Sequence, residues 1–379
     1  EALETLLGRR LRISPSQLEK YYTCRYGYFL QYVLGLPPPQ AGRALRRPER
    51  HPHALGAPDG PRPSPWPRQP CAGLQPFLDL DDEAMAALAG LLVDEYAKRY
   101  LPEDTARFAY LLSRLKKSMT GLLCYLRDEQ RQSSFKPVAC ELKIGPGEDA
   151  VRGQTYRLSD GRTVQLIGTV DRADEWIEDD GTRWVRVVDY KTGTKKLDLR
   201  EVYCGLDCQM LLYLFSLTRD ADGRFTGAEP AGVLYLLADP APETTTRGKA
   251  PGAWNTSWTA SSGMSRRSST HGRRGDGAVS ALQLPGRCTQ PYQKEKRADK
   301  AKLSRIQLHL DDLVTQMGEQ LYSGCIAAEP LVTGRSPCRW CDYGFICCHE
   351  EGIGERALDA PAKPFEPPEN SDKKKEEDQ

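Results

Sequence analysis

Several features are missing from this sequence of 379 residues, and each absence excludes a class of function. The formal net charge is only +1, so no overall basic character indicates nucleic-acid binding. No run of about 18 apolar residues is present, which excludes a membrane-spanning helix. The phosphate-binding pattern G-x-x-x-x-G-K-S/T is also absent, so no ATP site and no helicase motor are visible.

Two further absences concern the start of the chain and its charge clusters. The first residue is Glu1 rather than methionine, and no signal peptide follows, which favours a piece of a longer protein. Because the overall charge is near zero, any contact with DNA has to come from local groups of lysine and arginine. Residues 114–117 and 191–196 contain such groups, although clusters of this kind are usually solvated surface.

Cysteine, by contrast, is plentiful, with 12 residues. Without a secretory signal, a framework of disulfide bonds is not expected. A metal or cluster site is the better interpretation for some of these cysteines, and buried thiols for the rest.

One short stretch organises the chain. Residues 187–193 read V-V-D-Y-K-T-G, a β-branched run that ends in Asp189 and Lys191. Residues i and i+2 of a strand share a face, so the carboxylate and the ammonium project together. Residues 164–172 form a second strand that ends in Asp171, and the gap of 18 residues (189 minus 171) fits a hairpin with its turn at 178–181. Two carboxylates then meet at one edge of a sheet, although Asp189 and Lys191 alone could be a solvated ion pair.

Three further residues extend this pattern. Gln209 and Tyr213 are i and i+4 in a helical segment and share one face of it. Glu141 lies in an alternating strand at 138–144, where a single glutamate is as often a surface residue as a functional one.

The ordered series Glu141, Gly168-x-x-Asp171, Asp189-x-Lys191 and Gln209-x-x-x-Tyr213 resembles the PD-(D/E)XK nucleases of the RecB-like branch. The resemblance covers about half of the chain. It implies an α/β fold with a restriction-endonuclease-like core, in which helices flank a mixed central sheet. It also implies that Asp171 and Asp189 hold Mg²⁺, that Lys191 orients water or offsets charge at the scissile phosphate, and that Gln209 and Tyr213 position Lys191 or the DNA.

The start of the chain extends the resemblance. Ser14, Pro15 and Gln17 predict the beginning of a helix with a capping box, and Cys24 follows. This S-x-S-x-L-E-x-Y-x-x-C segment resembles AddB-type subunits of the bacterial AddAB helicase–nucleases. The resemblance implies that Cys24 is the first ligand of an iron–sulfur cluster, whereas the residues alone fit a buried thiol.

Three more cysteines lie close together near the other end of the chain. Cys338, Cys341 and Cys347 have the spacing C-x2-C-x5-C, and Cys348 is adjacent to the last of them. Four thiolates suit zinc or an iron–sulfur cluster, and a distant cysteine plus a close trio favours a 4Fe–4S cluster that staples the two ends of the domain. We expect a structural role, since such a staple closes a very long loop.

The composition divides the chain into six segments. An N-terminal helix with the first cluster cysteine (1–36) precedes a proline- and arginine-rich segment (37–78), and the nuclease core (79–240) precedes a Ser-, Gly- and Arg-rich segment (241–298). A C-terminal helix with the cysteine loop (299–352) and a disordered tail (353–379) follow. The two atypical segments are either flexible insertions or frame-shifted translation. The metal-binding histidine implied by the resemblance is unplaced, because His51 and His53 lie between prolines.

The leading hypothesis is a Mg²⁺-dependent DNA exonuclease domain of a helicase–nuclease subunit that acts in double-strand break repair by homologous recombination. We expect DNA ends, single- or double-stranded, as substrate, an AddA-type subunit as partner, no membrane contact and a location in the bacterial cytoplasm. The alternatives are a catalytically inactive iron–sulfur module that binds DNA and a stand-alone Cas4-like exonuclease.

Overall fold

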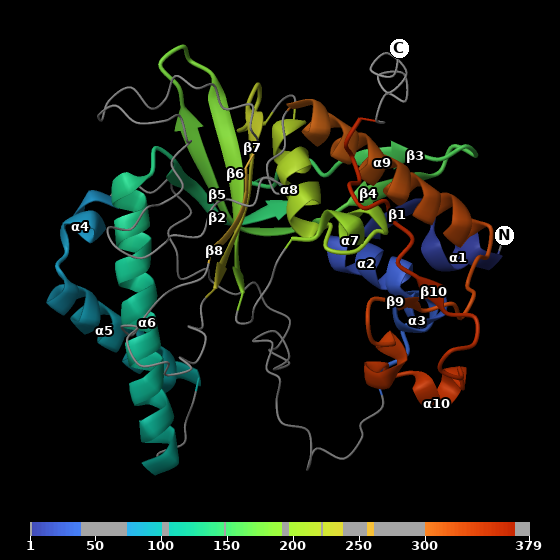
Figure 1. Ribbon diagram of the computed structural model, residues 1–379, viewed down its shortest axis with the longest axis horizontal. Helices are drawn as coiled ribbons and strands as arrows, with labels where there is room; N and C mark the ends of the chain where they lie inside the picture. The colour runs from blue at the N-terminus through green and yellow to red at the C-terminus, as the bar shows by residue number, and fades with distance from the viewer. Residues whose placement is uncertain are drawn as a thin grey trace, which may run out of the picture.

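The protein is an α/β molecule built around a mixed sheet of five strands (Figure 1). The computed structural model describes residues 2–38, 74–100, 106–147, 149–191, 197–220, 223–237, 256–260 and 300–367. The strand order is β2-β5-β6-β7-β8, with β6 and β7 parallel and the other neighbours antiparallel. The bounds are β2 (Lys136–Ile144), β5 (Gly168–Ile177), β6 (Arg183–Lys191), β7 (Glu229–Leu237) and β8 (Thr256–Ala260). The predicted mixed central sheet is confirmed.

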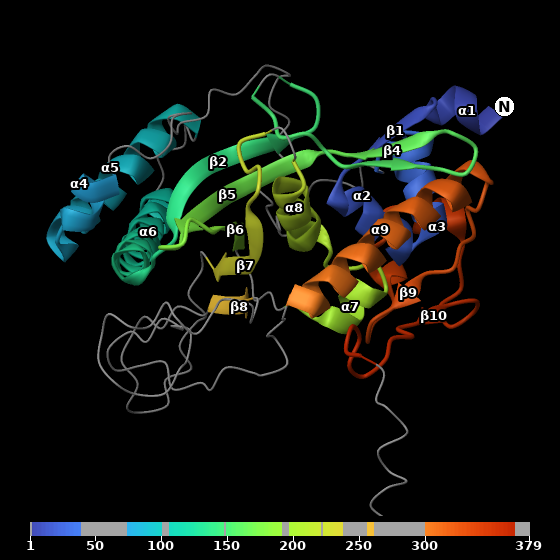
Figure 2. The same cartoon turned by 90° about the horizontal axis from the view of Figure 1, so that it is seen from above.

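Helices cover both faces of this sheet (Figure 2). Helix α6 (Ala106–Gln132) lies on one face, where Tyr125 packs against Val188 and Leu234. Helices α5 (Asp82–Tyr100) and α4 (Leu74–Asp79) pack outside α6. Helix α8 (Gln209–Thr218) covers the other face, and eight of its ten residues are buried because its sequence is apolar on all sides.

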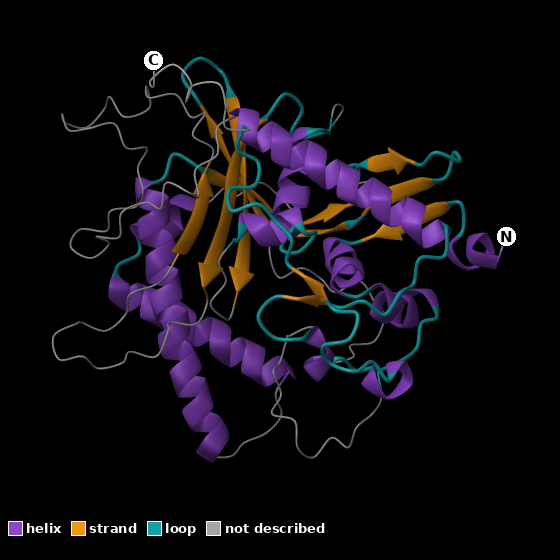
Figure 3. Cartoon of the chain, turned by 45° about the vertical axis from the view of Figure 1, so that its right-hand side comes forward, coloured by secondary structure: helices purple, strands orange, loops and turns teal. Residues whose placement is uncertain are grey.

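A smaller three-stranded sheet extends the central one. Its order is β1-β4-β3, with β1 (Arg10–Ile13), β4 (Thr163–Leu166) and β3 (Thr155–Arg157). Helix α9 (Lys300–Tyr322) crosses this sheet (Figure 3), and Gly318 allows the close approach, since a Cβ there would lie 2.7 Å from Val164. We expected one strand over 163–173, but the chain changes sheets at Ile167, between β4 and β5.

The first helices follow the predicted capping signals. Ser14 caps α2 (Pro15–Thr23): its hydroxyl accepts from the N–H of Gln17, and the Gln17 side chain accepts from the N–H of Ser14 at 2.7 Å. Helix α1 (Ala2–Leu7) precedes β1, while α3 (Arg25–Tyr28) and a π-helix (Phe29–Val33) follow α2. The pattern therefore predicted the start of the helix correctly but missed the break at Cys24.

The helix expected over 199–217 is two helices. Helix α7 (Leu199–Tyr203) ends before a turn in which Gly205 has φ of +84° and Asp207 has φ of +53°. A Cβ on Gly205 would collide with the ring of Tyr22, so glycine permits both the turn and the packing. Continuous apolar spacing concealed this break.

The C-terminal segment ends in short elements that pair with each other. These are β9 (Leu331–Val332), a 3-10 helix (Pro337–Trp340), α10 (Gly344–Cys347) and β10 (Arg356–Ala357), with β10 parallel to β9. The tail that we expected to be disordered from residue 353 is therefore ordered as far as 367, and Phe365 is only 9% exposed. Most of the two atypical segments, including His51 and His53, lies outside the described residues.

Candidate active site and cysteine pocket

Two acidic side chains meet at one edge of the central sheet. The register of the antiparallel strands β5 and β6 places Asp171 opposite Asp189. Asp189 is only 4% exposed, and its Oδ2 lies 2.8 Å from the Nζ of Lys191. The backbone N–H of Tyr190 donates to Oδ2 of Asp171 at 3.1 Å and joins the two strand ends. The structure thus brings together three residues that the sequence predicted as a group.

This arrangement has the chemistry of a site for a divalent cation and a phosphate. Carboxylate oxygens are ligands that Mg²⁺ prefers, and Mg²⁺ commonly takes one or two of them together with water and substrate phosphate. The ammonium of Lys191 adds a positive charge beside them. Within the described ranges, no three His, Cys, Asp or Glu side chains form a metal-binding group by themselves.

Tyr213 lies against this pair of acids. Burial raises the pKa of Tyr213 to about 12, and the charges of Asp171 and Asp189 add to this effect, while a backbone hydrogen bond with Thr169 opposes it. The hydroxyl therefore remains protonated at neutral pH. A Cβ on Gly168 would lie 2.5 Å from this hydroxyl, so the glycine in the predicted Gly-x-x-Asp pattern makes room for Tyr213.

Gln209 is the first residue of α8, and a residue that sequence reasoning missed holds this helix start. Oε1 of Glu19, on α2, accepts from the backbone N–H of Cys208 at 3.0 Å and of Gln209 at 3.3 Å. A carboxylate at a helix N-terminus satisfies donors that have no partner within the helix. Glu19 lies in the S-x-S-x-L-E segment, so the signal was present, but its contact with α8 is tertiary.

Asp207 and Tyr235 form a second buried polar pair that the sequence did not indicate. The Tyr235 hydroxyl donates to Oδ1 of Asp207 at 3.0 Å, and both residues are less than 5% exposed. Burial raises the pKa of Tyr235 strongly, with smaller contributions from Asp207 and Asp189. This pair lies behind Asp189 and supports the side of the site that faces α8.

Glu141 occupies a strained position on β2. The register places Cys140 opposite Arg172 and Leu142 opposite Val170, so Glu141 faces Asp171 across the two strands. Its φ of +50° is rare for a residue with a side chain, and its side chain is exposed. Strain of this kind concentrates at functional positions.

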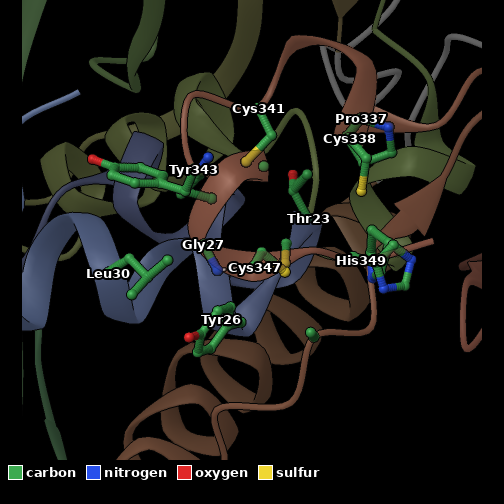
Figure 4. Close-up of a pocket in the computed structure, with 15 residues that line it drawn as sticks. Thr23, Tyr26, Gly27, Leu30, Pro337, Cys338, Cys341, Tyr343, Cys347 and His349 are labelled. Atoms are coloured by element: carbon green, nitrogen blue, oxygen red, sulfur yellow. Dashed lines mark hydrogen bonds between the residues drawn. The ribbon is translucent and has the colours of Figure 1, made fainter. Parts of the chain in front are cut away.

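Four cysteine side chains line one pocket at the other end of the molecule (Figure 4). Cys24, between α2 and α3, lies across a cavity of about 90 Å³ from Cys338, Cys341 and Cys347. Burial raises the pKa of both Cys338 and Cys347, and the neighbouring thiols raise it further. Segments separated by 314 residues (338 minus 24) therefore supply one set of soft ligands.

Two neighbours of this pocket differ in their relation to it. Cys348 is exposed, with its thiol directed to the carbonyl of Phe345 at 3.6 Å, whereas Cys347 lines the cavity. His349 also lines it, and its buried Nε2 has no hydrogen-bond partner in the described part of the chain. The sequence analysis did not single out His349.

Comparison with known proteins places these features in a family. The family model described as the PD-(D/E)XK nuclease superfamily matches residues 12–57 and 70–348. The chain belongs to this superfamily. The match includes every residue that we assigned to the active site and to the cysteine pocket.

Relatives with one shared name come from several bacteria, and each is named as an ATP-dependent helicase/deoxyribonuclease subunit of the second, or B, type. The chain is 31% identical over 228 residues to the relative from Clostridioides difficile (strain 630), an overlap of 59% of this chain and 19% of the relative. It is 28% identical over 376 residues to the relative from Desulforudis audaxviator (strain MP104C), with 92% and 30% covered. The chain thus spans less than a third of the length of these relatives.

Several predicted features lie in parts of the chain that the structure does not describe. These are the basic residues Lys195 and Lys196 and the two histidines, His51 and His53. No described helix has the length and apolar character needed to cross a membrane.

Proposed function

We propose that this chain is a Mg²⁺-dependent deoxyribonuclease domain of a helicase–nuclease subunit. The observation that carries the proposal is the meeting of Asp171, Asp189 and Lys191 at one sheet edge in a member of the PD-(D/E)XK superfamily. Relatives that overlap 92% of the chain are named as helicase/deoxyribonuclease subunits, which favours a subunit over a stand-alone exonuclease.

The residues divide the work as follows. Asp171 and Asp189 would hold Mg²⁺, which when bound supplies positive charge and lowers the pKa of water. Lys191, fixed 2.8 Å from Asp189, presents its ammonium where negative charge develops on the scissile phosphate. Tyr213 keeps its proton at neutral pH and can donate a hydrogen bond beside the two acids.

A cleavage assay tests this function. End-labelled single- and double-stranded DNA is incubated with the protein in Mg²⁺ or in EDTA, beside the variant Asp189→Ala. We expect cleavage only with Mg²⁺ and a loss of at least about a hundredfold in the variant, since it removes an interaction on which the chemical step depends. Intact DNA with the parent protein would instead support the inactive DNA-binding module.

We further propose that Cys24, Cys338, Cys341 and Cys347 hold a 4Fe–4S cluster. The donor set fits this group, because four thiols from two ends of the chain line one cavity, and the orphaned Nε2 of His349 offers a hydrogen bond to a sulfur there. Among the described residues the thiols do not form a preassembled metal group, so we expect the 337–348 loop to tighten around the cluster.

The remaining parts of the proposal concern partners and context. The relatives are named as one subunit of a helicase/deoxyribonuclease, which supports assembly with an AddA-type helicase–nuclease subunit and DNA as substrate. Processing of double-strand breaks for homologous recombination in the bacterial cytoplasm, starting at DNA ends, is the role that we infer from this assembly.

A further inference from the structure

A row of cations covers the outer face of the small sheet. Directly paired residues of neighbouring strands share a face, and Arg10, Thr163 and Arg157 form one such rung, while Arg12, Gln165 and Thr155 form the next. The opposite face carries Leu11, Ile13, Val164 and Leu166, which are all buried. The outer face therefore has three arginines and no acidic side chain in these two rungs.

A basic groove joins this face to the active site. Arg12 and Lys143 line an open cavity of about 320 Å³ whose floor includes Ile144, Pro146 and Ile167. Across the part of the chain that the structure describes, neither these two cations nor Arg10 and Arg157 form an ion pair. Their charge is thus available to a ligand.

The chain direction leads from the cations to the catalytic acids. Strand β4 continues into β5 (Figure 2), and the alternating residues Gln165, Ile167, Thr169 and Asp171 follow one another along this path. Lys143 is paired with Thr169, one rung from Asp171, which corresponds to about 7 Å. Arg12, opposite Gln165, is six residues or about 20 Å from Asp171.

We propose that Arg10, Arg12, Arg157 and Lys143 form a track that binds the phosphate backbone of the DNA strand being cut and delivers it to Asp171. This inference rests on the proposed nuclease function. The spacing suits an extended strand, since cations lie one rung and three rungs from the scissile position. The track contains no aromatic platform and no acidic or amide pair aimed at bases, apart from Gln165, so it reads phosphates rather than sequence.

Binding of a labelled single-stranded oligonucleotide, measured without divalent ions and over a range of salt, tests the track. All proteins carry Asp189→Asn, so that no cleavage interferes. In Arg12→Gln/Lys143→Gln we expect a weaker affinity and a fall of about 1.4 in the slope of log affinity against log salt, at about 0.7 for each phosphate contact with a single strand.

Two matched variants complete the experiment. Arg12→Lys/Lys143→Arg retains both charges and should retain the slope. Arg114→Gln/Lys117→Gln removes two exposed cations from α6, the other basic cluster, and should leave the slope unchanged. An unchanged slope in Arg12→Gln/Lys143→Gln, or an equal fall in the α6 variant, overturns the track. Failure of the nuclease function shows separately, as absence of Mg²⁺-dependent cleavage by the protein with Asp189 intact.

Discussion

At the scale of single residues, Gly168 controls the closeness of two parts of the active site. The hydroxyl and ring of Tyr213 occupy the space that a side chain at this position would need. The backbone of β5 and the helix α8 can therefore approach each other beside Asp171, and a single methyl group would separate them.

We predict that Gly168→Ala lowers cleavage by about a hundredfold, because a displacement of about 1 Å at a reacting centre can have that effect. Overpacking should also reduce the free energy of unfolding by about 1–3 kcal/mol. Single-turnover cleavage and denaturant unfolding measure the two effects. Gly90→Ala is the matched control, because a Cβ there meets open space in α5. Unaltered cleavage by Gly168→Ala would contradict the steric argument.

Sequence reasoning at this scale found the residues whose role is local. Asp171 and Asp189 follow from two strands and a turn, and the cap at Ser14 follows from its neighbours. Glu19 and Asp207 could not be found in this way, because their roles depend on α2 and β7 packing beside α8, which no local pattern encodes.

At the scale of elements, a buried ionic network fastens α6 to the sheet. Asp174 accepts hydrogen bonds from Arg172 at 2.7 Å and from Arg186 at 2.8 Å, and Arg186 also contacts Glu129 of α6. All four side chains are less than 6% exposed. A buried carboxylate of this kind is tolerated only because its charge is paired.

This network predicts a loss of stability in acid. Burial acts to raise the pKa of Asp174, but the charges of Arg172 and Arg186 outweigh it and hold the pKa below its ordinary value. The ionised group therefore stabilises the fold above about pH 4, the pKa of an unfolded aspartate, and this contribution disappears as the pH falls through the lower folded pKa.

Asp174→Asn should reduce the free energy of unfolding at pH 7 by about 3–5 kcal/mol, because it leaves buried arginines uncompensated. It should also flatten the dependence of stability on pH below 4. Urea unfolding from pH 7 to pH 3 measures both effects, and Asp179→Asn in the exposed β5–β6 turn is the control. An Asp174→Asn protein as stable as the control would contradict this account.

Sequence patterns predicted the elements better than their ends. The apolar spacing indicated α5, α6 and α9, and the hairpin of β5 and β6 appeared with its turn as predicted. The pattern missed the division of 163–173 at Ile167 and of 199–217 at Gly205, because apolar periodicity continues through both. The partners that force these breaks, the second sheet and Tyr22, are distant in the sequence.

At the scale of the whole molecule, the two ends of the described chain form one unit. Arg356 donates to the carbonyl of Tyr22 at 2.6 Å, Tyr343 donates to the carbonyl of Leu36 at 2.8 Å, and Tyr22 donates to the carbonyl of Leu313 at 2.7 Å. The cysteine pocket lies among these contacts. The spacing of the cysteines predicted such a closure, whereas the hydrogen bonds that accompany it had no sequence signal.

We predict that Cys341→Ser abolishes the visible absorbance of the cluster, lowers iron and sulfide content and weakens DNA binding, because the ends of the domain lose their staple. Iron and sulfide analysis of anaerobically purified protein is the primary measurement. Cys348→Ser, which alters an exposed thiol outside the cavity, should retain the cluster. A variant Cys341→Ser with full iron content would exclude this cysteine as a ligand.

The support of α8 by Glu19 has a consequence for how the protein is made. Glu19 belongs to α2, and α2 is held in place by residues that a ribosome adds almost 300 positions later, such as Leu313 and Arg356. During synthesis, the strands with Asp171 and Asp189 emerge long before these anchors. A nascent chain therefore carries its acids without a fixed α8 beside them, and the nuclease is completed only when translation of the C-terminal segment is finished.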